Sequence, residues 1–256
     1  MSRRSAPLIS IRQPPGAPTA YHGHVELVEA RIIVAGATGA LGEAIARELH
    51  ARGAQVALAG RDGARLEQLG AELGAPTARF DLFSPSGIAP ALAAATAALG
   101  GLDALIVATG VVAFGPEPEL PGDVLRDLFV VNATGPIRLI REALPHLDDG
   151  GAIVALTAVV AEHPTAGMAA YSASKAALSA YLTALRRERR RSGLTVLDVR
   201  PSHLDTGFET RALAGSPPDL PPAGDHLAVA REIVDALRDG RRELAYDLRE
   251  RALVPR

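Results

Sequence analysis

The sequence has 256 residues, of which 48% are hydrophobic, and its formal net charge is −2. This length fits one large α/β domain or two small ones, and the charge gives no overall attraction for nucleic acid or an anionic membrane. The absence of cysteine excludes disulfides, thiolate metal sites and cysteine nucleophiles. No apolar run approaches the roughly 18 residues of a membrane span, and no secretory signal is evident, so we expect a soluble cytoplasmic protein.

The first 24 residues differ in composition from the rest of the chain. They contain four prolines and scattered arginines without a helical or strand period. This pattern predicts an extended arm over residues 1–24, ahead of one folded domain over residues 25–256. His22 and His24 flank Gly23 in the arm, but no third ligand is evident, so we expect no metal site.

A glycine-rich turn follows the first predicted strand. The β-branched, apolar run Arg31–Ala35 is typical of a strand buried on both faces, and it leads directly into Gly36–Gly42. The helix after it has Leu41, Ile45 and Leu49 on one face. Glycines at such a junction allow a tight turn and a close approach of the backbone to a phosphate, which a helix N-terminus favours. We interpret the turn as a phosphate site; the alternative is an ordinary turn that needs glycine.

The second predicted strand, residues 55–59, is followed by Gly60, Arg61 and Asp62. An acid at this place binds the ribose 2′-hydroxyl of NAD, whereas an arginine accommodates the 2′-phosphate of NADP. Gly60 occupies the place of the acid and Arg61 follows it, which favours NADP(H). Asp62 could instead cap the helix that begins near Gly63.

The remaining chain alternates between strand and helix patterns. Further strands are expected at residues 78–80, 103–107, 151–157 and 194–199 and near Leu244, and helices at 85–99, 123–147, 168–191 and 225–238. The helix 123–147 should bend near Gly135-Pro136. Residues 207–224, rich in Pro, Gly and Ala, predict a mobile loop. This order predicts a single-domain, doubly wound parallel sheet of about seven strands with helices on both faces.

One of these helices carries Tyr171 and Lys175, four residues apart and therefore on one face. A lysine charge within reach favours the phenolate, so the tyrosine could act as a general acid or base. The same spacing also occurs on solvated helices. The basic residues of Arg186–Ser192 indicate the solvated end of this helix, where cations suit the macrodipole; a nucleic-acid patch is the less favoured alternative.

Taken together, the motifs resemble those of the short-chain dehydrogenase/reductase family over residues 31–246. The segments that carry the likeness are Gly36–Gly42, Asp81-Leu82, Ala108-Thr109-Gly110, Asn132, Tyr171-x-x-x-Lys175 and Pro201–Thr206. The resemblance implies a Rossmann-type domain that binds a nicotinamide dinucleotide and moves hydride to or from a carbonyl or alcohol.

The resemblance also implies roles for individual residues. Tyr171 would donate or accept the proton, Lys175 would bind the nicotinamide ribose and lower the pKa of Tyr171, and Asn132 would hold a water in a proton relay. The implied cofactor contacts are Gly36, Thr38, Gly39, Ala40, Leu41 and Gly42 at the pyrophosphate, Arg61 at the 2′-phosphate, Asp81 and Leu82 at the adenine, Thr206 at the nicotinamide, and Ala108, Thr109, Gly110, Pro201 and Leu204 elsewhere along the cofactor, with Tyr171 and Lys175 also touching it.

Four departures from the family pattern are evident. The family's catalytic serine position is Ala158, and the adjacent Thr157 could replace it only if the strand end slips or twists, since successive strand residues face opposite sides. The glycine spacing is that of the extended members of the family. The usual Asn-Ala-Gly turn is Ala108-Thr109-Gly110. Ser202 and His203 stand in the usual Pro-Gly turn. His203, together with Glu162 and His163, could restore some polarity at the substrate end.

We therefore expect an NADP(H)-dependent oxidoreductase acting on a ketone or secondary alcohol, weakened by the loss of the hydroxyl at position 158. The alternative is a catalytically impaired dinucleotide-binding sensor or assembly partner. By resemblance, the helices near Asn132 and Tyr171 pair across a two-fold axis, which implies a homodimer or homotetramer. Ala173, Ala176, Ala177 and Ala180 would permit such close packing. Nucleic acid, membrane and metal are not expected partners.

Overall fold

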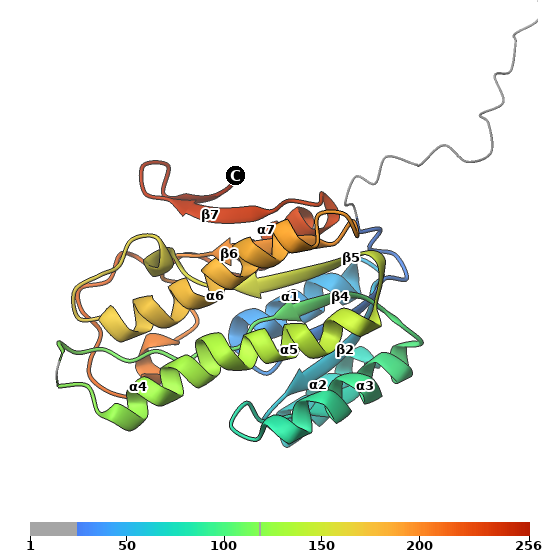
Figure 1. Ribbon diagram of the computed structural model, residues 1–256, viewed down its shortest axis with the longest axis horizontal. Helices are drawn as coiled ribbons and strands as arrows, with labels where there is room; N and C mark the ends of the chain where they lie inside the picture. The colour runs from blue at the N-terminus through green and yellow to red at the C-terminus, as the bar shows by residue number, and fades with distance from the viewer. Residues whose placement is uncertain (1–24, 118) are drawn as a thin grey trace, which may run out of the picture.

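Eight strands form one sheet in the order β3-β2-β1-β4-β5-β6-β7-β8 (Figure 1). The computed structural model describes residues 25–117 and 119–256, so the predicted arm over residues 1–24 and its two histidines lie outside the described residues. The strands are β1 (Arg31–Ala35), β2 (Gln55–Gly60), β3 (Thr77–Arg79), β4 (Leu102–Val107), β5 (Leu147–Leu156), β6 (Thr195–Arg200), β7 (Glu243–Asp247) and β8 (Ala252–Pro255).

Helices cover both faces of the sheet, as predicted. They are α1 (Ala40–Ala51), α2 (Gly63–Leu73), α3 (Ile88–Leu99), α4 (Gly122–Phe129), α5 (Gly135–Ala143), α6 (Ala169–Glu188) and α7 (His226–Arg238). One apolar core lies between the sheet and α1, α2 and α7, and a second lies between the sheet and α3, α5 and α6. In Figure 1, α5 and α6 lie in front of the sheet and α1 lies behind it. The doubly wound architecture follows from strands whose two faces are both apolar.

The last strand departs from the predicted all-parallel sheet. β8 pairs antiparallel with β7, from Leu244 opposite Pro255 to Asp247 opposite Ala252. The link between the two strands is a tight turn in which Arg251 has a left-handed φ of 52°. A connection this short can only return the chain antiparallel, because a parallel neighbour needs a long crossover.

The predicted helix over residues 123–147 is divided into several elements. A π-helical turn, η2 (Val130–Thr134), separates α4 from α5, so the break precedes the predicted site at Gly135-Pro136. α5 ends at Ala143, a 3-10 turn covers Leu144–His146, and β5 begins at Leu147, earlier than the predicted start at residue 151. α6 ends at Glu188 rather than at residue 191. Among the described residues, no helix is both long and apolar enough to cross a membrane.

Candidate active site

The turn after β1 requires glycine at two positions. Gly36 has a left-handed φ of 90°, and a Cβ there would lie 2.7 Å from the Ala108 carbonyl carbon. At Gly42, in the first turn of α1, a Cβ would lie 2.2 Å from the Gly36 carbonyl oxygen. Gly39 is the N-cap of α1 and supplies no side-chain cap. The first N–H groups of α1 therefore meet a tight turn without a capping side chain, which is the arrangement that binds a phosphate.

This turn lies where the order of the strands changes direction, because β1 is flanked by β2 on one side and β4 on the other. The N–H of Ala108 donates to the Ala35 carbonyl oxygen at 2.7 Å, so the residues after β4 lie beside the turn. Ligands of doubly wound sheets bind in the crevice at such a switch point. Thr38, Ala40 and Leu41, the other predicted contacts of the turn, are partly exposed there.

The end of β2 presents a cationic edge. Arg61 is exposed, and the Nε of Arg79 donates to the Arg61 carbonyl oxygen at 3.1 Å, which brings a second guanidinium to this edge. Beside Arg79 the surface is hollowed over about 470 Å³. The Asp62 carboxylate accepts from the N–H of Arg65 at 3.1 Å and caps α2, which confirms the predicted cap. Asp62 is thus engaged with its own helix.

Asp81 and Leu82, the predicted adenine contacts, follow β3. The Oδ1 of Asp81 accepts from the N–H of Phe83 at 3.0 Å and so closes a local turn. Leu82 is buried, and its side chain lies 2.9 Å from the place of a Cβ at Gly135, the first residue of α5. These contacts hold the end of β3 against α5.

Asn132 lies in the π-helical turn η2 and is fully buried. Its Oδ1 accepts from the N–H of Val111 at 2.9 Å, and its Nδ2 donates to the Val111 carbonyl oxygen at 2.9 Å and to Ser174 Oγ at 3.0 Å. A single amide therefore fixes the chain after β4 and joins it to α6.

Lys175 reaches the same place from α6. It is 3% exposed, and its Nζ donates to the Leu156 carbonyl oxygen at 3.0 Å, at the end of β5. A Cβ at Gly110 would lie 3.3 Å from this Nζ and 3.6 Å from Asn132 Oδ1. The predicted residues Gly110, Asn132 and Lys175 are therefore brought together. Because Gly110 has no side chain, its backbone can approach the buried ammonium closely.

Tyr171 lies one turn before Lys175 and is 7% exposed. Its ring centroid is 6.5 Å from that of Phe208, whose Cζ lies 3.7 Å from the place of a Cβ at Gly110. Phe208 belongs to the segment 207–224 predicted as a loop, and no local pattern marked this residue as a neighbour of the tyrosine. The surroundings of Tyr171 are an apolar cluster, whose other buried members are Val112, Ala113, Phe114, Leu128, Ala158, Val160, Met168 and Ala170.

Burial shifts the pKa values of both side chains of the pair. It raises the pKa of Tyr171 above its ordinary range, because the phenolate is disfavoured away from water. It lowers the pKa of Lys175 to about 8, and the charge of Asp198 acts in the opposite direction. The sequence predicted that Lys175 would lower the pKa of Tyr171; in the structure that pKa is raised instead, and burial is the cause. Lys175 is also the only lysine in the sequence, and an arginine could not titrate in this way.

The Thr157 hydroxyl is engaged by β6, so it does not replace the serine that the resemblance predicts at position 158. Its side chain is 3% exposed, and its Oγ1 donates to Asp198 Oδ1 at 2.5 Å and lies 3.3 Å from the Val199 carbonyl oxygen. The hydroxyl is therefore turned toward β6, as the alternation of strand side chains requires. Ala158, the next residue, packs in the apolar cluster with Tyr171.

The polar residues considered as substitutes also face other partners. Glu162 lies 3.3 Å from Arg200 and 3.2 Å from Arg256. The Nδ1 of His203 lies 2.9 Å from the Pro221 carbonyl oxygen, and its Nε2 lies 3.4 Å from Glu209. His163 is exposed. The contacts of Glu162 and His203 thus hold loops rather than restore a polar group next to Tyr171.

The predicted contacts after β6 connect that strand to neighbouring loops. The Pro201 carbonyl oxygen accepts from the N–H of Val159 at 2.9 Å. Leu204 forms a β-bridge with Gly224, and the N–H of Thr206 donates to the Leu204 carbonyl oxygen at 2.8 Å. The segment therefore lies between the loop after Ala158 and the region 207–224.

A cluster of possible metal ligands lies in the same region, formed by Asp205, Asp225 and His226. Asp205 Oδ1 accepts from the N–H of His226 at 2.9 Å and lies 2.6 Å from its Nδ1, and Asp225 Oδ1 accepts from the N–H of Leu227 at 2.8 Å. These hydrogen bonds cap α7 and account for the cluster without an ion.

Sequence reasoning missed Asp198 and partly misjudged the basic cluster at the end of α6. Asp198 stands between Leu197 and Val199 in a fully buried strand, and a charge in that position is a signal that could have been noticed. Arg186 is not solvated as predicted: it donates to the carbonyl oxygens of Val196 and Arg242 and pairs with Glu243 at 2.9 Å. The other arginines of the cluster are exposed.

Comparison with known proteins agrees with this geometry. The short chain dehydrogenase family matches residues 30–215. The rat dehydrogenase/reductase SDR family member 7B is 30% identical over 226 residues, which are 83% of this chain and 70% of the rat protein. A short chain dehydrogenase from Burkholderia cenocepacia J2315, solved in complex with NADP, is 27% identical with a TM-score of 0.74 and coverage of 84% and 94%. One from Streptomyces avermitilis is 29% identical with a TM-score of 0.76 and coverage of 84% and 87%.

The family match covers most of the chain and includes the glycine turn, Asn132, Tyr171 and Lys175. The chain belongs to the short-chain dehydrogenase/reductase family of NAD(P)-binding oxidoreductases.

Proposed function

We propose that the protein is an NADP(H)-dependent oxidoreductase that transfers hydride between the nicotinamide and a ketone or secondary alcohol, with Tyr171 exchanging the proton. The observation that carries this proposal is the meeting of Lys175 and Asn132 at Gly110, next to the turn that begins at Gly36. The turn Gly36–Gly42, whose space a side chain would fill, fits the phosphates of a dinucleotide. The buried pair Tyr171 and Lys175 on α6 fits its nicotinamide end.

In the reducing direction, NADPH held at this site would supply the hydride for the carbonyl carbon. Tyr171 gives its phenolic proton to the carbonyl oxygen, so that the C=O group becomes CH–OH. Burial raises the pKa of Tyr171, so the phenol holds its proton at neutral pH and the release of that proton depends on the charge of Lys175. Lys175 binds ribose hydroxyls with the donors that Leu156 leaves free and stabilises the resulting phenolate. Asn132 holds the proposed relay water that returns a proton to the pair.

Preference for NADP(H) is supported by the edge formed at the end of β2. Arg61 is exposed there, Arg79 is hydrogen-bonded to its backbone, and Asp62 is engaged as the cap of α2. Two guanidinium groups at this place attract a 2′-phosphate. We expect NADPH to bind at least about tenfold more tightly than NADH, because a single charge-assisted hydrogen bond to the 2′-phosphate contributes that much affinity.

The substrate is proposed to be a carbonyl compound with apolar substituents. Tyr171 lies among apolar side chains that include Phe208, Ala158 and Met168. A charged substituent would be desolvated there without a partner, which is costly. Aliphatic and aromatic ketones should therefore be reduced faster than keto acids of similar size.

The test combines binding and turnover. NADPH and NADH are titrated against the protein by fluorescence, and NADPH oxidation is followed with apolar ketones and with keto acids. Tyr171→Phe is the matched variant, because it removes only the hydroxyl; its turnover should fall by about 10²–10⁴ while NADPH binding is retained. Turnover equal in Tyr171→Phe and in the unmodified protein would overturn the proposed chemistry.

The second part of the proposal concerns assembly into a homodimer or homotetramer through α6. Ala173 and Ala180 are exposed on this helix, and Ala176 and Ala177 are partly exposed, so a stripe of small side chains faces outward. Small residues let two helices approach closely. Light scattering of Ala173→Arg beside the unmodified protein tests this, with a shift to monomer expected.

A further inference from the structure

Strand β6 carries a charged pair within the protein interior. Asp198 is 1% exposed and Arg200 is 6% exposed. Burying a carboxylate is costly unless several partners compensate for the lost water. The partners of Asp198 therefore indicate what its charge does in this fold.

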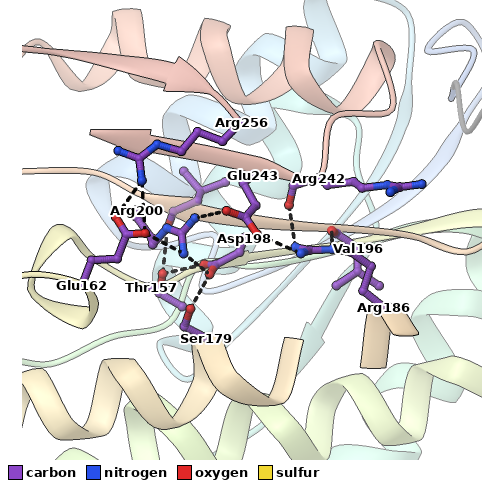
Figure 2. Close-up of polar contacts among 11 residues, drawn as sticks. Thr157, Glu162, Ser179, Arg186, Val196, Asp198, Arg200, Arg242, Glu243 and Arg256 are labelled. Atoms are coloured by element: carbon purple, nitrogen blue, oxygen red, sulfur yellow. Dashed lines mark hydrogen bonds and ion pairs between the residues drawn. The ribbon is translucent and has the colours of Figure 1, made fainter. Parts of the chain in front are cut away.

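The contacts of Asp198 tie β6 to α6 and to the end of β5 (Figure 2). Thr157 Oγ1 donates to Oδ1 at 2.5 Å, and Ser179 Oγ donates to Oδ2 at 2.6 Å. Ser179 lies one turn after Lys175 on α6. Lys175 in turn donates to the carbonyl oxygen of Leu156, the residue before Thr157. These contacts form a closed ring through α6, β5 and β6.

Charges surround the ring on the side of β6, as Figure 2 shows. Arg200 Nη1 lies 3.4 Å from Asp198 Oδ2 and 3.3 Å from Glu162, and Arg200 Nη2 pairs with Glu243. Arg186 pairs with Glu243 from the other side at 2.9 Å. Arg200 is thus shared among three carboxylates, which leaves the Asp198 charge incompletely balanced by its own strand.

The charge of Asp198 also favours the ammonium form of Lys175, against the effect of burial. The groups that face Lys175 are the Leu156 carbonyl of β5, the Asn132 amide of η2 beside Gly110, Tyr171 on its own helix and Asp198 of β6. Of these, Asp198 carries the negative charge that favours the ammonium against burial.

We propose that Asp198 is a positioning residue of the active site, whose carboxylate clamps the end of β5 through Thr157 and α6 through Ser179 and so fixes the Lys175 ammonium next to Tyr171. Its catalytic meaning rests on the proposed function, because the reaction uses that ammonium. In this ring the Thr157 hydroxyl donates to Asp198, so it is not available to a substrate.

Because the sequence has one lysine, the charge of Lys175 can be measured directly. Growth on lysine labelled with ¹³C at Cε gives one side-chain signal, whose shift against pH reports the Lys175 titration without activity. The midpoint near pH 8 should fall by about 0.5–1 pH unit in Asp198→Asn. It should rise in Arg200→Gln, because Lys175 then becomes the main counter-charge of Asp198.

Asp103→Asn serves as the control. Asp103 also lies in a strand and pairs with an arginine, Arg31, but at the opposite end of the sheet from Lys175. Its substitution should leave the Lys175 midpoint unchanged. Opposite shifts in the two β6 variants support the proposal, and unchanged midpoints in them overturn it. Should Asp198→Asn fail to fold, the direction of the shift in Arg200→Gln decides.

The functional readout is NADPH affinity at two pH values. In Asp198→Asn, affinity should fall about three- to tenfold near pH 8, where Lys175 has lost its proton, and recover near pH 6, where the ammonium is charged again. A defect equal at both values would indicate a structural role only and overturn the proposal. If no variant and no wild-type sample binds NADPH, the proposed function fails, while the lysine titration still decides the role of Asp198.

Discussion

The two sides of the active-site edge are built from different parts of the chain. On the dinucleotide side, the backbone defines the shape: a Cβ at Gly36 or Gly42 would collide with main-chain atoms. On the substrate side, side chains define the shape, and there Ala158, the position at which the resemblance predicts a serine, packs within an apolar cluster. A site made of backbone tolerates no substitution, whereas a site made of side chains can exchange one group and keep the fold. The following predictions test this contrast.

The largest effect is expected from Gly42→Ala on the dinucleotide side. The new Cβ would lie 2.2 Å from the Gly36 carbonyl oxygen, so the turn must move. We expect loss of about 1–3 kcal/mol of stability and of measurable NADPH binding. Thermal unfolding and NADPH titration measure the two. Gly87→Ala is the control, because nothing lies within 4 Å of its Cβ position. Tight NADPH binding by Gly42→Ala would contradict the view that the backbone shapes the dinucleotide side and tolerates no substitution.

Ala158→Ser should supply the hydroxyl that the family pattern predicts on the substrate side. A hydroxyl at this position would stabilise the developing charge on the carbonyl oxygen, and one such donor is worth about 10²–10³ in rate. We expect NADPH oxidation with a ketone to accelerate by this factor while affinity for NADPH stays unchanged. NADPH binding without turnover in either form would instead favour a dinucleotide sensor.

The pH dependence of stability without dinucleotide reports on the buried pair. The pKa of Lys175 is lowered to about 8 in the fold from 10.5 in the unfolded chain, so between these values the unfolded state binds more protons and stability rises with pH. For Tyr171 the raised pKa makes stability fall above about pH 10. Urea unfolding at about pH 7.5 and 9.5 should show a gain in the wild type that is absent in Lys175→Met. An equal change in unfolding free energy between the two pH values in the wild type and in Lys175→Met would show that Lys175 is not buried as described.

The smallest effect is expected from Asp62→Ala at the dinucleotide edge. Loss of a cap costs about 1 kcal/mol, while the ratio of NADPH to NADH affinity should stay the same. Asp225→Ala, which removes the cap of α7, provides a matched stability control. A changed ratio in Asp62→Ala alone would mean that Asp62 contacts the ribose.

Much of this architecture could be read from local patterns. The run Arg31–Ala35 followed by glycines predicted β1 and the turn, and Asp62 was recognised as a possible cap, because such signals depend on near neighbours in the chain. The break in the long helix was also expected, but it lies at Val130–Thr134 rather than at Gly135-Pro136. There Asn132 bonds to Val111, a contact that no local pattern encodes.

By itself, the sequence determined the alternation of strands and helices, the glycine turn and the pairing of Tyr171 with Lys175 on one helix face, because each depends on spacing along the chain. Only the tertiary structure decided where side chains from separate strands and helices meet. It turned Thr157 toward Asp198, placed Phe208 next to Tyr171 and returned β8 antiparallel. Such contacts join residues far apart in sequence, and their burial and charge exist only once the sheet has brought them together.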